Sequence, residues 1–330
     1  MNERSSARVR YWMLCMILKA RLGLYLIKGV ALLSRVLPLG RVFIGLPRVL
    51  RHLPAGWRGR DYSLCRQNLT ALGYESTLAN KLSCRFGALQ WQRALHEQLY
   101  PRQRPFDLRA WIADVPWVDP QRLAQIERPT LYLLTHTGEY WMAVASLMAR
   151  HVRPTRFVIP IWNFADPFTR HSLQQLEGLG HWVDVLDVAE PGTALSMARA
   201  LKRGDSVLLF CDLPVSLGAV RFGEPLPGRL FHRPAQFVKG PLFLASKLGC
   251  DALLLGHQAQ LGGKGRVQVL ERITAAPLPV MQAQWMAALD GFLAAAPEQW
   301  LYLPRLEAFY HRQRPATKPR QLGAARGALR

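Results

Sequence analysis

The sequence predicts an α/β protein with a mainly parallel central sheet flanked by helices. After Pro129, five short strand-like runs alternate with segments of helix length; the runs are TLYLLT, RFVIPI, HWVDVL, DSVLLFC and DALLLGHQ. This alternation is typical of a mainly parallel sheet covered by helices. The composition agrees with a folded chain, because 50% of the residues are apolar and only 20% are charged.

Residues 1 to 60 are predicted to form a helical, membrane-associated extension. Apolar and aromatic residues predominate from Tyr11 to Leu33, but Lys19, Arg21 and Lys28 interrupt them. No uncharged run therefore reaches the roughly 20 residues that a spanning helix needs. Cations spaced among Trp, Tyr, Leu and Ile favour a helix lying in the plane of the membrane interface. A buried amphipathic helix is the alternative.

The net charge of +21 is concentrated at the two ends of the chain. Residues 1 to 60 contain 12 Lys or Arg and one acidic residue, and residues 308 to 330 contain six Lys or Arg and none. An anionic partner is expected. A membrane surface fits better than nucleic acid, because no base-reading motif accompanies the charge. Residues 311 to 330 are predicted to be a basic flexible tail.

Residues 61 to 310 are predicted to form one domain of catalytic size. The pattern from Asp61 to about Tyr100 is helical and amphipathic, so a helical lead-in to about residue 125 precedes the α/β core. Five cysteines without CxxC spacing indicate neither a zinc site nor a disulfide framework, and a reducing, cytoplasmic setting follows.

His136 is the first candidate for chemistry, because it follows the run TLYLLT, and functional residues of parallel sheets gather at the carboxyl ends of strands. A histidine can accept a proton near neutral pH, and a carboxylate on its other ring nitrogen fixes the tautomer. Glu139 lies three residues later and is expected to meet His136 across one helical turn. Gly138 permits a tight junction and close approach by substrate. A structural or capping role for the pair is an equal alternative.

Asp212 ends the run SVLLFC and is expected to line the same cleft as His136. Other chemistries find little support. There is no G-x-S-x-G motif, no H-x-x-x-H pair and no phosphate-binding glycine loop after a strand, so we expect no metal and no cofactor. What remains is direct, base-assisted transfer without a covalent intermediate.

Six segments, taken in order along nearly the whole chain, resemble those of one family. They are RQNL, LTHTGEYW, ARALKRGDSVLLFCDLP, VRFGEPL, HRPAQFVKGPLFLASKLGC and PEQWLY. The order resembles the bacterial lipid A biosynthesis acyltransferases, the lauroyl and myristoyl transferases of the lysophospholipid acyltransferase-like superfamily. The chain departs from that family in two places. The family signature is a histidine, four residues and then Asp or Glu, which would place the acid at position 141, where this chain has Trp141. Pro160 stands about where an arginine is expected, with Arg156 nearby.

The resemblance implies transfer of a fatty acyl chain from an acyl thioester, on acyl carrier protein or coenzyme A, to a hydroxyl of an anionic lipid A-type glycolipid at the cytoplasmic face of the inner membrane. It implies that His136 is the general base, that Glu139 orients it, and that Asp212 positions substrate or His136. The candidates for contact with anionic substrate lie around one loop, with a solvated basic loop as the alternative; they are Arg221, Phe222, Gly223, Arg229, Arg233 and Lys239.

Two other functions remain open at this point. One is acylation of another glycolipid, such as the lipid terminus of an exported or capsular polysaccharide, which the departure at Trp141 favours. The other is a membrane-associated relative that has kept the fold and lost catalysis. A structure separates them by showing whether Glu139 reaches His136 and whether a tunnel leads to the two residues.

Overall fold

The computed structural model describes residues 39–52, 59–99, 105–120, 130–161, 173–188, 190–217 and 220–310. Residues 1–38 and 53–58 of the predicted N-terminal extension, and residues 311–330 of the predicted basic tail, lie outside the described residues. Within the described part of the chain, no helix combines the length and the apolar character needed to cross a membrane.

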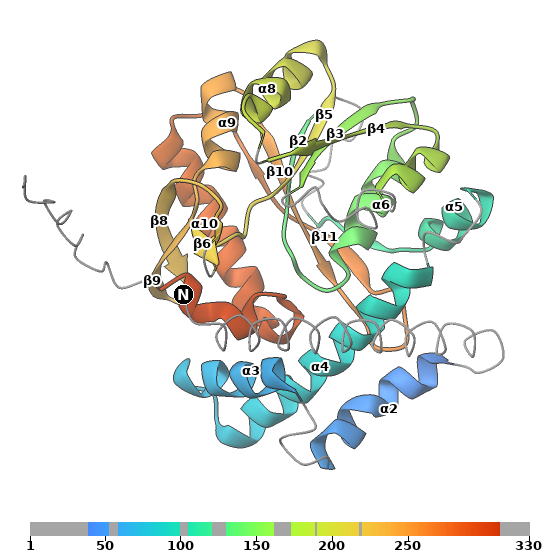
Figure 1. Ribbon diagram of the computed structural model, residues 1–330, viewed down its shortest axis with the longest axis vertical. Coiled ribbons are helices and arrows are strands. Elements are labelled where there is room, and N and C mark those ends of the chain that lie inside the picture. Colours follow the sequence, from blue (N-terminus) through green and yellow to red (C-terminus); the bar gives the residue numbers. More distant parts are fainter. Residues whose placement is uncertain are drawn as a thin grey trace, which may run out of the picture.

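The centre of the fold is a seven-stranded, mostly parallel sheet with helices on both faces, which confirms the predicted fold class (Figure 1). The strand order is β1-β11-β10-β2-β5-β3-β4, and the antiparallel pair is β10 with β11. The strands are β1 (Trp117–Val118), β2 (Leu131–Leu134), β3 (Arg156–Ile161), β4 (Trp182–Asp187), β5 (Ser206–Phe210), β10 (Ala252–Gln258) and β11 (Arg266–Ile273).

The central strand β2 is buried on both faces, because helices cover both sides of the sheet. Leu131 and Leu133 belong to one apolar cluster, and Tyr132 and Leu134 belong to the other. Successive strand residues point to opposite faces, so this alternation divides the core into two layers. The helices of the first layer are α8 (Thr193–Arg203), α9 (Gly240–Leu248) and α10 (Leu278–Ala295), and those of the second are α5 (Pro105–Ala113), α6 (Tyr140–Arg150) and the 3-10 helix η3 (Gln175–Leu179).

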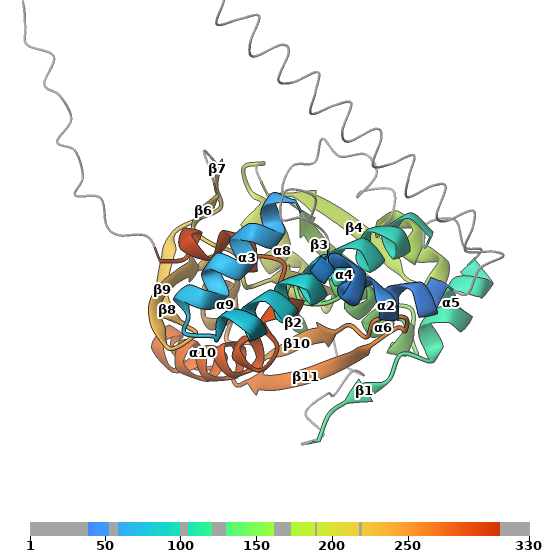
Figure 2. The same ribbon diagram turned by 90° about the horizontal axis from the view of Figure 1, so that it is seen from below.

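A group of three helices precedes the sheet in the chain and lies along one side of it (Figures 1 and 2). These are α2 (Leu39–His52), α3 (Arg60–Ala71) and α4 (Ser76–Leu99). Helix α4 packs against both α2 and α3 and also against η4 (Pro297–Gln299), while α3 packs against η5 (Leu303–Ala308). The helical lead-in therefore joins the amino-terminal part of the chain to the segment that follows α10.

Two short hairpins follow β5, and they correct one reading of the sequence. Strands β6 (Ser216–Leu217) and β7 (Val220–Arg221) pair with each other, as do β8 (Pro225–Leu230) and β9 (Arg233–Val238). One of the segments of helix length predicted between the strand-like runs is AQFVKGPLFLASKLG, but its first residues belong to β9 and only its later part forms α9. A short apolar run does not distinguish strand from helix, and here the pairing with β8 decides.

Candidate active site

The candidate site forms where two neighbouring parallel strands end. His136 follows β2, and Asp212 follows β5, which pairs with β2 in parallel register. The His136 Nδ1 atom lies 2.8 Å from Asp212 Oδ1, and the His136 backbone N–H donates to Asp212 Oδ2 at 2.7 Å. The structure thus brings Asp212 into direct contact with His136. The carboxyl ends of adjacent parallel strands meet at one edge of the sheet, which brings residues 76 positions apart into contact.

Asp212 is completely buried and accepts three hydrogen bonds. Besides the two from His136, Trp300 Nε1 donates to Oδ2 at 2.9 Å. A buried carboxylate without such donors would be very costly, so these bonds hold it in one orientation. The sequence segment PEQWLY contains Trp300, but its resemblance alone did not indicate that the indole supports the carboxylate.

The segment around Trp300 also holds the backbone on both sides of His136. Leu301 N–H donates to His136 O at 2.9 Å, and Gly138 N–H donates to Gln299 O at 2.8 Å. Thr137 and Trp300 form an isolated antiparallel bridge between these bonds. The loop that carries His136 is therefore held against a second chain segment, which limits the movement of the imidazole.

Three aromatic rings surround the His136 imidazole. Phe210 stacks on it with ring centroids 4.1 Å apart, while Tyr140 and Tyr302 meet it edge-on at 5.2 and 5.1 Å. The His136 side chain is 13% exposed, and among the described residues its Nε2 atom has no hydrogen-bond partner. If Nδ1 carries the proton that faces Asp212, Nε2 has a free lone pair. An imidazole held in this way can remove a proton from a hydroxyl group.

Glu139 does not orient His136, so the predicted pairing is wrong. Its carboxylate is buried and faces α4, where Oε1 accepts from Gln92 Nε2 at 2.7 Å and Oε2 lies 2.7 Å from His96 Nδ1. The helical spacing rule failed because α6 begins only at Tyr140, after both His136 and Glu139. Asp212 takes the place on His136 that Glu139 was expected to fill.

Replacing Glu139 with glutamine is therefore expected to affect stability more than catalysis. Gln92 Nε2 also donates to Gln260 O and Gly263 O, and Gln92 Oε1 accepts from Gly262 N–H, so the Gln92 amide keeps its orientation. The oxygen of the new glutamine would therefore accept from Gln92, and its nitrogen would face His96. The charge-assisted bond between the carboxylate and His96 would be lost. We expect a loss of about 1 to 3 kcal/mol in the free energy of unfolding, and the rate of the base-assisted transfer that the sequence predicts should stay within a few-fold of the native rate. Denaturant unfolding and initial rates test this. A loss of rate without a loss of stability would restore Glu139 to the catalytic group.

Gly138 forms the tight strand-to-helix junction that the sequence predicted, with a φ of 54°. An added Cβ would stand 2.6 Å from His257 O and 2.7 Å from Ala259 N. A side chain is excluded because the end of β10 fills this space. The glycine lets the His136 loop pack against β10.

His257, at the end of β10, is a neutral histidine below the His136 loop. Its Nδ1 accepts from Glu139 N–H at 3.0 Å, so its Nε2 carries the proton and donates to Lys264 O at 3.0 Å. The side chain is completely buried, and burial lowers the pKa of His257 to about 4. Protonation would place a second donor against the Glu139 amide, which cannot accept it.

The unfolding free energy is consequently expected to fall on acidification between pH 6.5 and about 4. In this window the unfolded chain, with an ordinary histidine, binds a proton that folded His257 excludes, so stability is complete above pH 6.5 and is lost towards pH 4. The contribution is at most about 3 kcal/mol. Denaturant unfolding at several pH values should show that the unfolding free energy depends less steeply on pH in His257→Gln than in the native protein. Burial lowers the pKa of His151 to about 4 as well, but His151 is present in both proteins. Equal slopes would contradict the assignment.

The predicted anion-contact residues are engaged by the protein around the two hairpins. Arg221 Nε donates to Gly223 O at 3.2 Å, Arg229 Nη2 donates to His232 O at 3.4 Å, and Arg233 Nη2 donates to Ala71 O. Lys239 pairs with Glu224 at 3.5 Å, and the Phe222 N–H donates to Val215 O at 2.9 Å. None of these residues is among the described contacts of His136 or Asp212.

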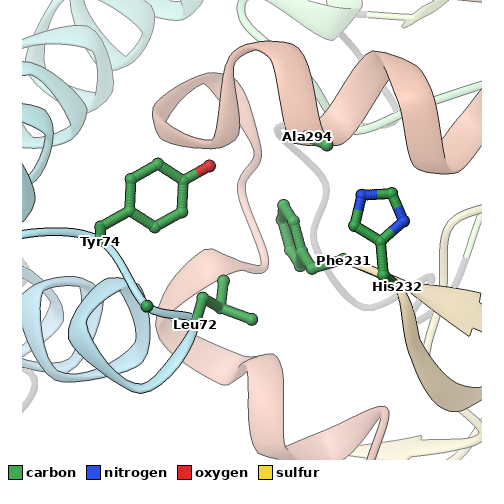
Figure 3. A pocket seen from close by; sticks show the side chains of 6 residues that line it. Leu72, Tyr74, Phe231, His232 and Ala294 are labelled. Carbon is green, nitrogen blue, oxygen red and sulfur yellow. The ribbon is translucent and has the colours of Figure 1, made fainter.

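A shallow surface hollow adjoins the site through Trp300. It is lined by Leu72, Gly73, Tyr74, Phe231, His232 and Ala294 (Figure 3). The Phe231 ring lies 6.1 Å from the Trp300 ring, and Trp300 in turn binds Asp212. None of the six lining residues is among the described contacts of His136; Trp300 links the hollow to the imidazole, through Asp212 and through the Tyr302 ring.

Cys211, beside Asp212, is a structural residue. It is buried, burial raises the pKa of its thiol, and Trp285 Nε1 donates to its Sγ at 3.2 Å. In the residues that the structure describes, no group of three or more His, Cys, Asp or Glu side chains has a geometry that could hold a metal ion.

Neither a comparison of the chain with protein-family models nor a comparison with curated proteins gives a match. The arrangement of the site therefore has to indicate what it can do. It presents one imidazole, held by a buried carboxylate and surrounded by aromatic rings, at the carboxyl edge of a parallel sheet. This is the arrangement that a general base requires.

Proposed function

We propose that the protein is an O-acyltransferase that moves a fatty acyl chain from an acyl thioester to a hydroxyl of a lipid A-type glycolipid. The observation that carries the proposal is the bond between His136 Nδ1 and the buried Asp212 carboxylate, which leaves Nε2 free to act as a base. The order of the sequence segments supports the substrate class. The acid missing at Trp141 does not weaken the proposal, because Asp212 supplies a carboxylate from the neighbouring strand.

The proposed reaction needs only the substrates and these two side chains. His136 Nε2 accepts the proton of the acceptor hydroxyl as its oxygen attacks the thioester carbonyl carbon. The new C–O bond forms, the C–S bond breaks, and the imidazolium returns the proton to the leaving thiolate. Asp212 stabilises the imidazolium between these steps, and the aromatic rings around His136 limit the access of water that would hydrolyse the thioester.

The donor is proposed to be acyl carrier protein or coenzyme A, and the place of reaction the cytoplasmic face of the inner membrane. A net charge of +21 favours both an acidic carrier and an anionic membrane surface. Helix α2 supports attachment to a membrane surface, because Ile44 and Val49 are 58% and 57% exposed on a helix that also exposes Arg48 and Arg51. Helix α2 packs on α4, and Arg93 of α4 lies over the Tyr140 ring that contacts His136, so the exposed helix is connected to the site.

Mass spectrometry of membrane glycolipids tests the proposal. Cells that contain the protein should carry a glycolipid with one additional acyl chain, and this species should be absent both without the protein and with His136→Ala. An additional chain on another glycolipid, such as the lipid end of an exported polysaccharide, would correct the acceptor and retain the chemistry. Identical lipids in all three cultures would contradict the proposed function.

A high-salt wash of the same membranes should release part of the native protein if attachment is peripheral.

A further inference from the structure

Arg93, on α4, is a largely buried cation with an incomplete set of hydrogen bonds. Its side chain is 14% exposed, and its Nε and Nη1 atoms are buried without a hydrogen-bond partner among the described residues. Its ion pair among the described residues is with Glu97, where Nε lies 3.4 Å from Oε1. Buried charged groups are normally both paired and hydrogen-bonded, so these free N–H groups call for an explanation.

Glu97 compensates this charge only in part. Burial raises the pKa of the Glu97 carboxyl, while the charge of Arg93 and the Tyr140 hydroxyl act in the opposite direction. Glu97 Oε1 also lacks a hydrogen-bond partner. The pair therefore leaves donors of the guanidinium available, in contrast to the arginines around the hairpins, which bind backbone carbonyl groups.

The Arg93 guanidinium lies next to the candidate active site. Its Cζ atom is 5.3 Å from the Tyr140 ring centroid, and the Tyr140 ring is 5.2 Å from the His136 ring. The charge of Arg93 also acts on Tyr302, whose ring meets His136 from another side. A single aromatic ring thus separates Arg93 from His136, and both side chains keep a small opening to solvent.

The chemistry of a guanidinium indicates the kind of group that would bind here. Its planar fork presents parallel N–H donors that match two oxygens of one phosphate group, and such charge-assisted bonds are strong where water is excluded. A phosphate bound at the end of this fork, by Nη1 and Nη2, would satisfy Nη1, one of the two nitrogen atoms that lack a partner among the described residues, while Nε stays beside Glu97. Both proposed substrates can carry one: the acceptor glycolipid on its sugar, and the donor on its phosphopantetheine arm.

We propose that Arg93 is the phosphate-binding residue of the His136 site. Only the choice of these two phosphate sources rests on the proposed function. The test measures binding, so that it is separate from catalysis.

The experiment uses the full chain in non-ionic detergent micelles and two matched pairs of probes. One pair is a diphosphorylated glucosamine-disaccharide lipid and its phosphate-free form; the other is S-dodecanoyl phosphopantetheine and S-dodecanoyl pantetheine. Tryptophan fluorescence gives the Kd of each. The variants are Arg93→Gln, Arg93→Lys and the double variant Arg93→Gln with Glu97→Gln, which removes both buried charges in case the single change impairs folding. Lys81→Gln, an exposed charge on the same helix, is the control.

The native protein and Lys81→Gln should bind the phosphorylated member of one pair at least about 10-fold more tightly than its partner. Arg93→Gln and the double variant should bind both members equally, and Arg93→Lys should retain part of the difference. The pair that shows the difference identifies the source of the phosphate. A difference that survives in folded Arg93→Gln or in the double variant, or its absence from the native protein, would overturn the inference. Arg93-dependent binding without acyl transfer by the native protein would overturn the proposed function and leave this inference standing.

Discussion

Replacing His136 with alanine is expected to lower the acyl-transfer rate about 100-fold to 10,000-fold, the usual contribution of a general base. The imidazole is the group whose free Nε2 faces away from Asp212, and among the described residues no second base contacts the same three aromatic rings. Initial rates at saturating donor and acceptor measure the effect. Removal of the ring leaves space beside Phe210, so the rate should be compared at a temperature at which the variant is fully folded.

His96→Ala is the informative companion to this variant. His96 also contacts a buried carboxylate through Nδ1, at 2.7 Å, but it belongs to α4 and pairs with Glu139. We expect His96→Ala to lower stability and to retain activity. A native rate in His136→Ala, or a large loss of rate in stable His96→Ala, would move the catalytic assignment away from His136.

Replacing Asp212 with asparagine is expected to lower the rate by about 10,000-fold, a magnitude seen when the carboxylate behind a catalytic histidine is neutralised. The reason lies in the donors around it. His136 N–H and Trp300 Nε1–H both point at Oδ2, so the oxygen of asparagine would take that position. Its NH₂ group would then face Nδ1, which would have to accept, and the proton would move to Nε2. An imidazole protonated at Nε2 cannot remove a proton from the acceptor.

Asp205→Asn provides the matched control, because Asp205 precedes β5 at its amino end and pairs with Arg203 near the surface. That variant should keep the native rate. The Asp212→Asn protein should also show a flatter dependence of rate on pH in the region where histidine titrates, which a purely structural defect would not produce. Activity of Asp212→Asn close to the native rate would exclude the His136–Asp212 pair from the reaction.

Local patterns in the sequence determined the fold class and identified His136 and Asp212 as candidate site residues. The five strand-like runs correspond to β2, β3, β4, β5 and β10, because short apolar runs between turn residues are informative by themselves. His136 and Asp212 were recognisable because each directly follows such a run. Strand β11 and the β8–β9 hairpin were not among the predicted runs. The start of β11, RVQV, does alternate polar and apolar residues, so this signal was overlooked. The hairpin strands contain Pro and Gly, and their pairing with each other decides their structure.

Only the tertiary structure decided which carboxylate contacts the His136 imidazole. By spacing, Glu139 was the nearer acid, yet it precedes the helix and turns to Gln92 and His96 on α4. Asp212 reaches His136 because β5 lies beside β2, and strand order is a non-local property that no short segment encodes. The same holds for Trp300 and Arg93, whose roles depend on segments far apart in the chain packing around one loop. Local sequence thus determined where reactive side chains emerge from the sheet, and packing determined which of them meet.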